Sequence, residues 1–233
     1  VELLEKLNVA RFKVGSGDTS NLLLLKRLGK TRKPILLSSG MSSFEELETS
    51  IVFLRKFGNP LTIMQCTSKY PTGPKDWGLN VIQELKNRFE LPVGFSDHSG
   101  TIYASLAAAV MGAEVFEFHV VFDKRQFGPD VSSSITIDQV KILTEGIKAI
   151  QTAMNNPLNK NNISQCEDLK KMFGKSLSVN KNKKAGEIIK FEDLESKKPS
   201  EYGISAIEFE KVIGKTLNKN LAKWSFLNWE DLD

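Results

Sequence analysis

The sequence has 233 residues, of which 40% are hydrophobic and 26% are charged, an ordinary composition for a globular protein with a sizeable core. Its 32 basic and 28 acidic residues leave a formal net charge of only +4, which gives no reason to expect nucleic acid as a partner. Part of the basic excess lies in one stretch, which we interpret as a solvated turn or as a groove for small anions such as phosphates: Lys175, Lys181, Lys183 and Lys184.

The first seven residues have helical spacing without an N-terminal cap, from which we expect further chain before Val1. Short apolar runs then recur with starts 23, 27, 30 and 23 residues apart, each followed by a helical pattern. This spacing predicts successive β-α units whose buried strands form a parallel sheet. The five predicted strands are Arg11–Val14, Pro34–Leu37, Leu61–Gln65, Leu91–Phe95 and Glu114–Phe118.

Helix signals lie between and after these strands. Ser43 and Glu46 form a capping box ahead of one helix, and further helices are predicted at residues 80–89, 101–111 and 138–154. After Met154 an asparagine-rich stretch and a short helix precede a turn-rich, β-like pattern. We therefore predict an α/β domain over residues 1–156, a linker over 157–174 and a small β-rich domain over 175–233.

Neither of the two cysteines, Cys66 and Cys166, lies in a Cys-x-x-Cys pair. Isolated thiols predict neither a disulfide framework nor a zinc site, and they favour a reducing compartment. The apolar run at residues 104–110 is far shorter than the roughly 20 residues that span a bilayer. With no signal peptide at its start, the sequence predicts a cytoplasmic protein without a membrane partner.

Polar, chemically capable residues follow each of the five predicted strands. At a single strand such residues are better explained as ordinary turn formers. All five strands end in this way, however, and in a parallel barrel the carboxyl ends of the strands share the face that carries the active site. The residues are Lys13 and Ser16, then Ser38, then Cys66, Thr67 and Ser68, then Ser96 and His98, and finally Glu117 and His119.

His98 and His119 are the only histidines in the sequence, and they follow neighbouring predicted strands. Adjacent parallel strands lie about 5 Å apart, so the two imidazoles could share one ion. Completed by carboxylate or water oxygens, such a site suits Mn²⁺ or Zn²⁺ acting as a Lewis acid. Spacing alone leaves metal binding and an ordinary structural role equally open.

Lys13, Thr67 and the serines at the same edge supply the ammonium and hydroxyl donors that a phosphate needs where no glycine-rich phosphate loop is present. Asp130 follows the last predicted strand within a Gly-Pro-Asp sequence. It is either an ordinary turn residue or a further member of the same site.

The motifs at the strand ends resemble the sialic acid synthases, in the same order along the chain. A later region, from Lys175 to Lys215, is similar to the antifreeze-like domain of that family. The motifs that carry the resemblance are Phe12–Asp18, Leu37–Met41, Cys66–Thr72, Gly94–Ser99, Glu117–His119 and Gly128–Asp130.

The resemblance implies a TIM (β/α)₈-type barrel, of which the sequence accounts for strands 4–8, followed by a small β-rich antifreeze-like domain. It implies condensation of phosphoenolpyruvate with N-acetylmannosamine or a related N-acylated aminosugar, with release of phosphate. The cofactor would be a divalent metal, Mn²⁺ first and Mg²⁺ or Co²⁺ as alternatives. The expected assembly is a homodimer whose antifreeze-like domains are exchanged between subunits.

The resemblance also implies roles for individual residues. Glu117 and Asp130 would be catalytic, and His98 and His119 would bind the metal. The residues expected to bind substrate are Lys13, Ser16, Ser38, Thr67, Ser68, Tyr70, Ser96 and Lys198.

Three positions depart from the family pattern. Ser68 stands where many members carry asparagine, Phe118 where many carry lysine, and Lys198 where an arginine usually contacts the acyl group of the sugar. Because lysine lacks the planar fork of arginine, the aminosugar stays open, and diacetylated sugars of the legionaminic or pseudaminic type remain alternatives.

Three kinds of function fit these observations. The first is a synthase, the second a non-catalytic protein that keeps the sugar or phosphate contacts, and the third a structural role for the antifreeze-like region alone. The intact pair of metal positions, Asp130 and the phosphate-binding set favour the synthase, because a non-catalytic remnant has no need to keep them all.

Overall fold

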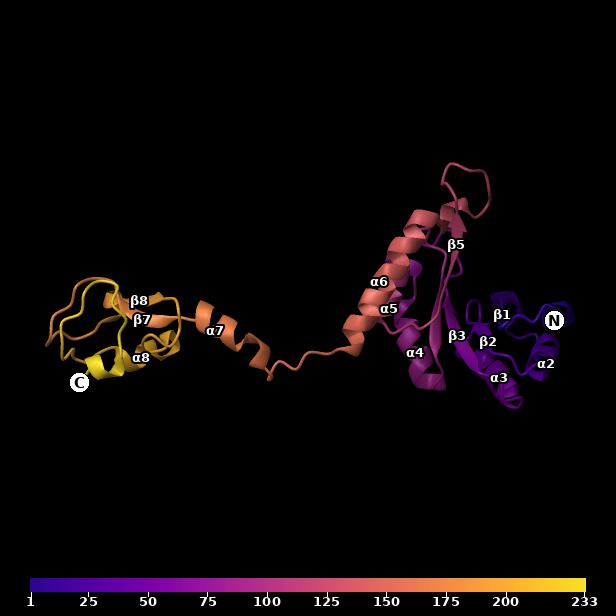
Figure 1. Cartoon of the computed structure of the whole chain (residues 1–233). Helices are drawn as coiled ribbons and strands as arrows, with labels where there is room; N and C mark the ends of the chain where they lie inside the picture. The colour runs from indigo at the N-terminus through magenta and orange to yellow at the C-terminus, as the bar shows by residue number, and fades with distance from the viewer. The chain divides into compact units, whose positions relative to one another are not determined.

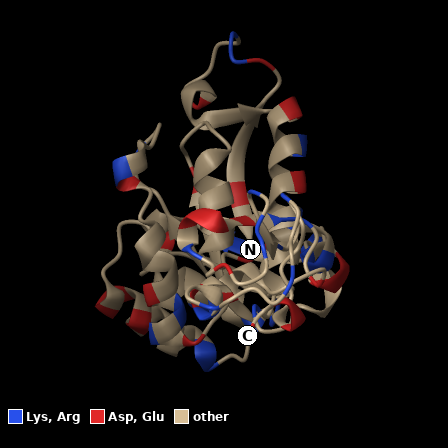
Figure 2. Ribbon diagram, turned by 90° about the vertical axis from the view of Figure 1, so that its left-hand side faces the viewer, with Lys and Arg blue, Asp and Glu red and all other residues tan.

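The computed structural model describes all 233 residues and divides into two compact units, Val1–Pro157 and Leu158–Asp233. Most of the predicted linker, from Leu158 onward, belongs to the second unit and contains the short helix α7 (Glu167–Phe173). No helix anywhere in the chain combines the length and the apolar character needed to cross a bilayer. Acidic and basic residues are interspersed over the helices and loops (Figure 2).

The first unit is a parallel sheet in which each strand pairs with the next along the chain (Figure 1). The five predicted strands are all present, but the prediction of five was wrong, because the sheet has a sixth. That strand is only three residues long and lies among serines, so no apolar run marks it. The strands are β1 (Phe12–Val14), β2 (Ile35–Ser38), β3 (Leu61–Cys66), β4 (Val93–Asp97), β5 (Phe116–Val121) and β6 (Ser134–Thr136).

Helices cover one face of this sheet, because the strand side chains on that face and the inward helix side chains form two buried apolar clusters. The predicted capping box of Ser43 and Glu46 is confirmed at the start of α3, and Thr136 with Gln139 caps α6 in the same way. The helices are α1 (Glu2–Lys6), α2 (Leu22–Lys30), α3 (Phe44–Arg55), α4 (Leu79–Phe89), α5 (Tyr103–Val110) and α6 (Ile137–Asn155).

The opposite face of the sheet is concave. Lys13 on β1 forms an ion pair with Glu117 on β5, four strands away. In a flat sheet these strands would lie roughly 19 Å apart, further than a lysine and a glutamate side chain reach together. The sheet therefore curls into part of a barrel, and the polar residues at its strand ends face a shared concave side.

The second unit has a small sheet of two antiparallel strands, β7 (Ser176–Val179) and β8 (Leu194–Lys197), with a short helix α8 (Phe209–Val212). Its separate apolar core includes Leu177, Val179 and Ile189. Most of the remaining chain follows tight turns joined by isolated antiparallel bridges.

Two loops of the second unit repeat the same structure 38 residues apart. In each loop an asparagine, Asn180 or Asn218, donates its backbone N–H to the carbonyl of an aspartate, Asp193 or Asp231. The asparagine side chain also donates to the carbonyl of the residue before that aspartate, at 2.8 Å in both loops. We call residues 180–194 the first repeat and residues 218–232 the second repeat.

The two repeats are related by an approximate twofold axis. Leu217 and Leu232 form the same antiparallel bridge as Val179 and Leu194. The axis passes between Lys183 and Leu221, which exchange backbone hydrogen bonds of 2.8 and 2.9 Å. The sequence carries a signal of this symmetry, because Asn-Lys-Asn at residues 180–182 and Glu-Asp-Leu at residues 192–194 both recur 38 residues later.

Candidate active site

The ion pair between Lys13 and Glu117 lies on the concave face and is partly open to solvent, with 26% and 44% of the two side chains exposed. Burial raises the pKa of Glu117, but the hydrogen bond and charge of Lys13, together with a hydrogen bond to Ser96, outweigh it and leave that pKa lowered. Glu117 is therefore ionised at neutral pH. The carboxylate can accept a proton, and the ammonium can bind a second anion.

A chain of side chains joins the ends of β1, β2 and β3. Ser16 Oγ lies 2.8 Å from Ser38 Oγ, which in turn lies 2.6 Å from Cys66 Sγ. Gly40 allows this approach, because a Cβ there would lie 2.4 Å from Ser16 Oγ and 3.1 Å from Cys66 Cβ. The result is a tight cradle of hydroxyl groups beside Lys13.

The two histidines lie together at the ends of β4 and β5, with ring centroids 5.2 Å apart. The Nδ1 atom of His98 is 3.0 Å from the Thr67 carbonyl and 2.9 Å from Thr67 Oγ1. Because a carbonyl only accepts, the proton sits on Nδ1 and the Nε2 lone pair stays free. Thr67 thus orients a histidine, as groups behind metal ligands commonly do.

Burial, reinforced by the charge of His119, lowers the pKa of His98. His98 is therefore neutral at neutral pH, the state in which imidazole binds a metal. No group of three or more His, Cys, Asp or Glu side chains converges in the structure. The two imidazoles fit a divalent ion as part of its ligand set, with oxygen ligands from water or substrate completing it.

Tyr70 and Asp130 adjoin the histidines from two loops. The Tyr70 ring lies 4.1 Å from that of His98 and 5.9 Å from that of His119. Burial, followed by the charges of Cys66 and Asp130, raises the pKa of Tyr70, so its hydroxyl stays protonated and can donate. Asp130 Oδ2 is 3.6 Å from His119 Nδ1, too long for a direct hydrogen bond.

Two predicted residues lie outside these contacts. Ser68 is exposed and lines a pocket of about 400 Å³ bordered by Ser39, Phe44 and Gln65. Lys198 belongs to the second unit, where its Nζ lies 4.5 Å from the ring centre of Phe173.

Sequence reasoning missed the contact of Cys66 with Ser38. The sequence pattern places Cys66 among the polar strand ends but gives it no role in the site. Its buried thiol contacts Ser38 at 2.6 Å, so it forms one side of the hydroxyl cradle.

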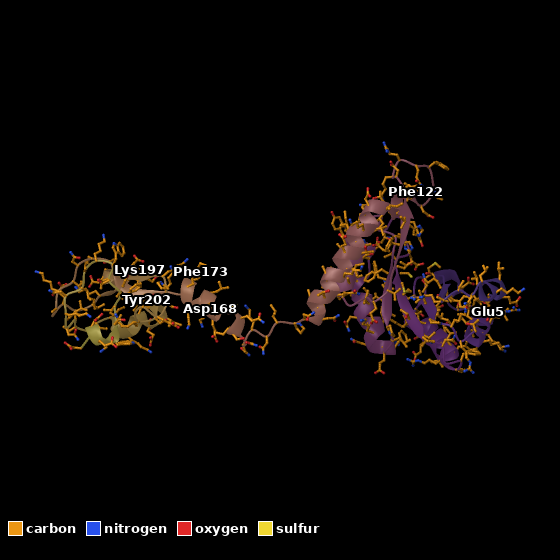
Figure 3. All side chains as sticks on the ribbon, in the orientation of Figure 1. Glu5, Phe122, Asp168, Phe173, Lys197 and Tyr202 are labelled. Carbon is orange, nitrogen blue, oxygen red and sulfur yellow. The ribbon has the colours of Figure 1, made fainter.

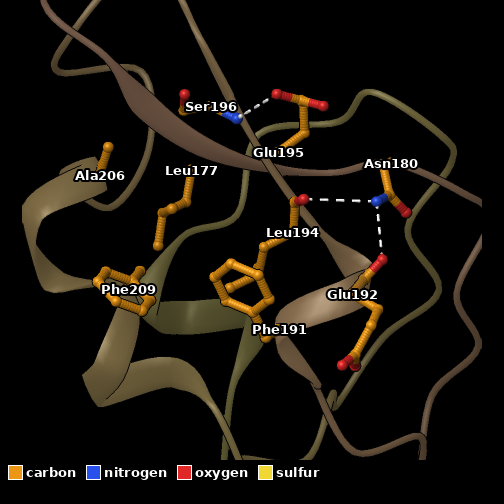
Figure 4. Close-up of a pocket in the computed structure, with 9 residues that line it drawn as sticks. All are labelled: Leu177, Asn180, Phe191, Glu192, Leu194, Glu195, Ser196, Ala206 and Phe209. Atoms are coloured by element: carbon orange, nitrogen blue, oxygen red, sulfur yellow. Dashed lines mark hydrogen bonds between the residues drawn. The ribbon is translucent and has the colours of Figure 1, made fainter.

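The second unit has a pocket of its own, of about 470 Å³ (Figure 4). Phe191 and Phe209 meet edge to face in it, with ring centroids 6.0 Å apart. Asn180 closes one side by donating to the carbonyls of Glu192 and Leu194. It contains neither a histidine nor a basic side chain, so its chemistry differs from that of the concave face.

Residues 1–159 match the model of the NeuB family. The chain belongs to the NeuB family. Among its relatives, N,N'-diacetyllegionaminic acid synthase of Campylobacter jejuni is 38% identical over 94% of this chain and 66% of its own length. N-acetylneuraminate-9-phosphate synthase of Homo sapiens is 32% identical over 92% of this chain and 60% of its own length. The chain thus spans about two thirds of these NeuB relatives or less.

A solved structure shares the fold of this NeuB family member. The N-acetylneuraminic acid synthetase of Leptospira borgpetersenii superposes with a TM-score of 0.67 at 30% identity, over 72% of this chain and 59% of that protein. The curled sheet of the first unit is therefore a part-barrel whose fold resembles that of this synthetase. The relatives are synthases of sialic, legionaminic and pseudaminic acids.

Proposed function

We propose that this protein is a nonulosonic acid synthase that condenses phosphoenolpyruvate with an N-acylated aminosugar and releases phosphate. The observation that carries the proposal is one concave face on which the Lys13–Glu117 pair, the hydroxyl cradle and the two histidines lie together. An anion site, a carboxylate base and a pair of metal ligands are the groups that this condensation requires.

Phosphoenolpyruvate would bind at the cradle. Lys13 is its cationic group, and Ser16, Ser38 and Ser96 supply hydroxyl donors to the phosphate and carboxylate oxygens. Binding would draw Lys13 partly away from Glu117, which the partial exposure of the pair allows. Ser68 and Thr67 would border the same substrate, Thr67 through its contact with His98.

His98, whose Nε2 lone pair is free, and His119 would hold the divalent metal, Mn²⁺ in the first place. When bound, such an ion polarises the aldehyde carbonyl of the sugar. Tyr70 and Asp130 would bind the sugar hydroxyl groups, the first as a donor and the second as an acceptor.

In the reaction, C3 of phosphoenolpyruvate forms a bond to the aldehyde carbon, whose oxygen takes up a proton and becomes a hydroxyl group. Water adds to C2, and its proton passes to Glu117, which is ionised and lies at the same edge. The C2–O bond to phosphate then breaks, leaving a keto acid and inorganic phosphate. One water is consumed for each phosphate released.

The remaining parts of the proposal concern the second unit. We infer that it is the antifreeze-like domain, and that in a homodimer it is exchanged so that Lys198 contacts the acyl group of the sugar bound by the partner. The antiparallel pair of strands and the short turns joined by isolated bridges support the assignment as an antifreeze-like domain.

The test is a coupled assay of phosphate release with phosphoenolpyruvate, Mn²⁺ and each of three sugars: N-acetylmannosamine and diacetylated precursors of the legionaminic and pseudaminic types. We expect release with one of them, dependent on Mn²⁺ and abolished in His98→Ala. Unchanged turnover in His98→Ala at saturating metal refutes its role. Binding of phosphoenolpyruvate without release for any sugar would favour the non-catalytic binding role instead.

A further inference from the structure

The loop after β5 places Asp130 at the site, although few of the loop's own apolar side chains are buried. It runs from Phe122 to Asp130 and continues into a short 3-10 helix, Val131–Ser133. Phe122 and Phe127 are both largely exposed, and Phe122 is labelled at the end of β5 in Figure 3. A loop that buries so few apolar side chains needs another contact to keep a fixed position.

Lys124 supplies that contact. Its ammonium group donates to the backbone carbonyls of Gly100, at 3.1 Å, Val131, at 3.5 Å, and Ser134. An ammonium group has three donors, and here all three point at carbonyl oxygens from two separate segments. No carboxylate lies within ion-pair distance of it, so its charge serves only these backbone groups.

Gly100 shows how closely the two segments approach. Its φ angle is +67°, and a Cβ there would lie 2.2 Å from the carbonyl oxygen of Ser132 and 3.3 Å from Lys124 Nζ. Only glycine fits both the backbone angle and the space. Since Gly100 follows His98 by two residues, Lys124 ties the Asp130 loop to the turn that begins at a metal-binding histidine.

Ser134, one of the residues that Lys124 contacts, also bonds to Asp130 itself. Ser134, whose carbonyl accepts from Lys124, donates its own hydroxyl to the Asp130 carbonyl at 2.6 Å. The backbone N–H of Ser133 donates to the same carbonyl at 3.0 Å. Ser134 also pairs with His119 in the sheet, so Lys124, Ser134, Asp130 and His119 form one connected set.

We propose that Lys124 is a positioning residue, which fixes Asp130 beside His119 by fastening the loop of residues 122–133 to the turn of residues 99–101. It touches no substrate. The inference deepens the proposed function, because it explains how Asp130 is held at the site. It rests on that function only for the role of Asp130 in the reaction, since the contacts of Lys124 do not depend on what the site does.

The test compares Lys124→Met, Lys124→Arg and Arg125→Met in the full chain without substrate. Arg125 is the matched control, because it is the adjacent basic residue and pairs only with Asp123 inside the loop. Two readouts apply: amide hydrogen exchange, and the imidazole NMR signals at one fixed pH, which are readily assigned with only two histidines in the chain.

In Lys124→Met we expect exchange at residues 99–102 and 122–134 to rise about tenfold, the effect of losing charged hydrogen bonds, and the His119 signals to shift. Lys124→Arg, which keeps several donors, should stay close to the wild type, and Arg125→Met should change neither segment. Unchanged exchange in Lys124→Met, equal effects in Arg125→Met, or faster exchange throughout the first unit including α3 would each overturn the proposal. Because no turnover is measured, this result is independent of whether the synthase assay succeeds.

Discussion

The two units hold their central ion pairs in opposite ways. In the first, Lys13 and Glu117 are 104 residues apart in the chain, meet across a curled sheet and remain partly exposed. In the second, Lys183 and Asp193 are 10 residues apart and almost fully buried, with 6% and 3% of their side chains exposed. A partly exposed pair can exchange its partner for a ligand, whereas a buried pair cannot be separated without unfolding its surroundings.

A local excess of lysines in the sequence therefore does not by itself indicate an anion-binding site. From the sequence, the lysine-rich stretch of the second unit is either a solvated turn or a groove for small anions. In the structure, however, Lys181 and Lys183 are both committed to Asp193. The single lysine of β1, Lys13, which no pattern of charge singles out, is the one that we propose binds the substrate anion. Removing charges should therefore impair activity in the first unit and stability in the second.

The largest expected effect is that of Glu117→Gln, which keeps the shape of the side chain and removes its charge. We expect turnover to fall by about 100-fold or more, the usual effect of losing a general base. The free energy of unfolding should change by less than about 1 kcal/mol, since exposed ion pairs contribute little. Phosphate release and urea unfolding measure the two quantities.

The matched control for that variant is Glu114→Gln. Glu114 precedes the same strand and pairs with Lys86 at 3.3 Å, away from the concave face. It should leave both turnover and unfolding unchanged. Full turnover in Glu117→Gln would show that Glu117 has no catalytic role. An equal loss of turnover in Glu114→Gln would show that the effect is not specific to the pair on the concave face.

Much of the first unit is predictable from the sequence because its signals are local. Apolar runs at regular spacing mark five strands, and the chain order of parallel strands places their polar ends on one face. The curl that joins Lys13 to Glu117 is a long-range property, and β6 lacks an apolar run. The contact between Thr67 and His98 could not be predicted either, since it depends on a loop conformation after β3.

The second unit is harder to predict for the opposite reason. Its turns depend on hydrogen bonds that Asn180 and Asn218 donate to backbone carbonyls, and in sequence these residues look like ordinary loop asparagines. The buried state of Lys183 could not be anticipated, because a lysine among other lysines is normally solvated. Asn-Lys-Asn and Glu-Asp-Leu recur 38 residues apart in the sequence, but the hydrogen bonds of the two loops show that this recurrence is structural.

The second prediction concerns acid. Burial raises the pKa of Asp193, but hydrogen bonds from Lys181, Lys183 and the Lys190 backbone outweigh it and hold that pKa far below its usual range. A carboxyl with a lowered pKa in the folded state contributes stability that is complete above its unfolded value, about 3.9, and is lost as the pH falls through the folded value. The second unit should therefore lose stability below about pH 4.

The measurement is unfolding followed by tryptophan fluorescence at several pH values in a Trp77→Phe background. In that background the only tryptophans are Trp224 and Trp229, both in the second unit. Asp193→Asn should cost about 3 kcal/mol at neutral pH and reduce the acid dependence of the unfolding midpoint. The exposed neighbour change Glu192→Gln serves as the control. An acid slope in Asp193→Asn as steep as that of the parent would assign the effect to other carboxyl groups.

The smallest expected effect follows from the symmetry of the repeats. Leu221 occupies the place of Lys183 across the twofold axis, and Asp231 in the second repeat is held by Lys219 without a second buried lysine. Lys183→Leu copies that arrangement and leaves Asp193 paired with Lys181. It should cost less than about 1.5 kcal/mol, well below the 3–5 kcal/mol typical of breaking a buried ion pair.

The reverse exchange provides the contrast. Leu221→Lys places a second buried ammonium group opposite Lys183, and the second repeat has Ser225 where the first has Glu187 as a further partner. We expect Leu221→Lys to lower the unfolding midpoint in urea far more than Lys183→Leu does, both followed by Trp224 and Trp229 fluorescence. If the two substitutions destabilise the second unit equally, the first repeat needs Lys183 for its stability, and the comparison with the second repeat does not predict the effect of removing it. If only Leu221→Lys is strongly destabilising, the loop of the first repeat folds without a buried lysine. Lys13 differs, because the first unit has no equivalent loop that shows the fold without it.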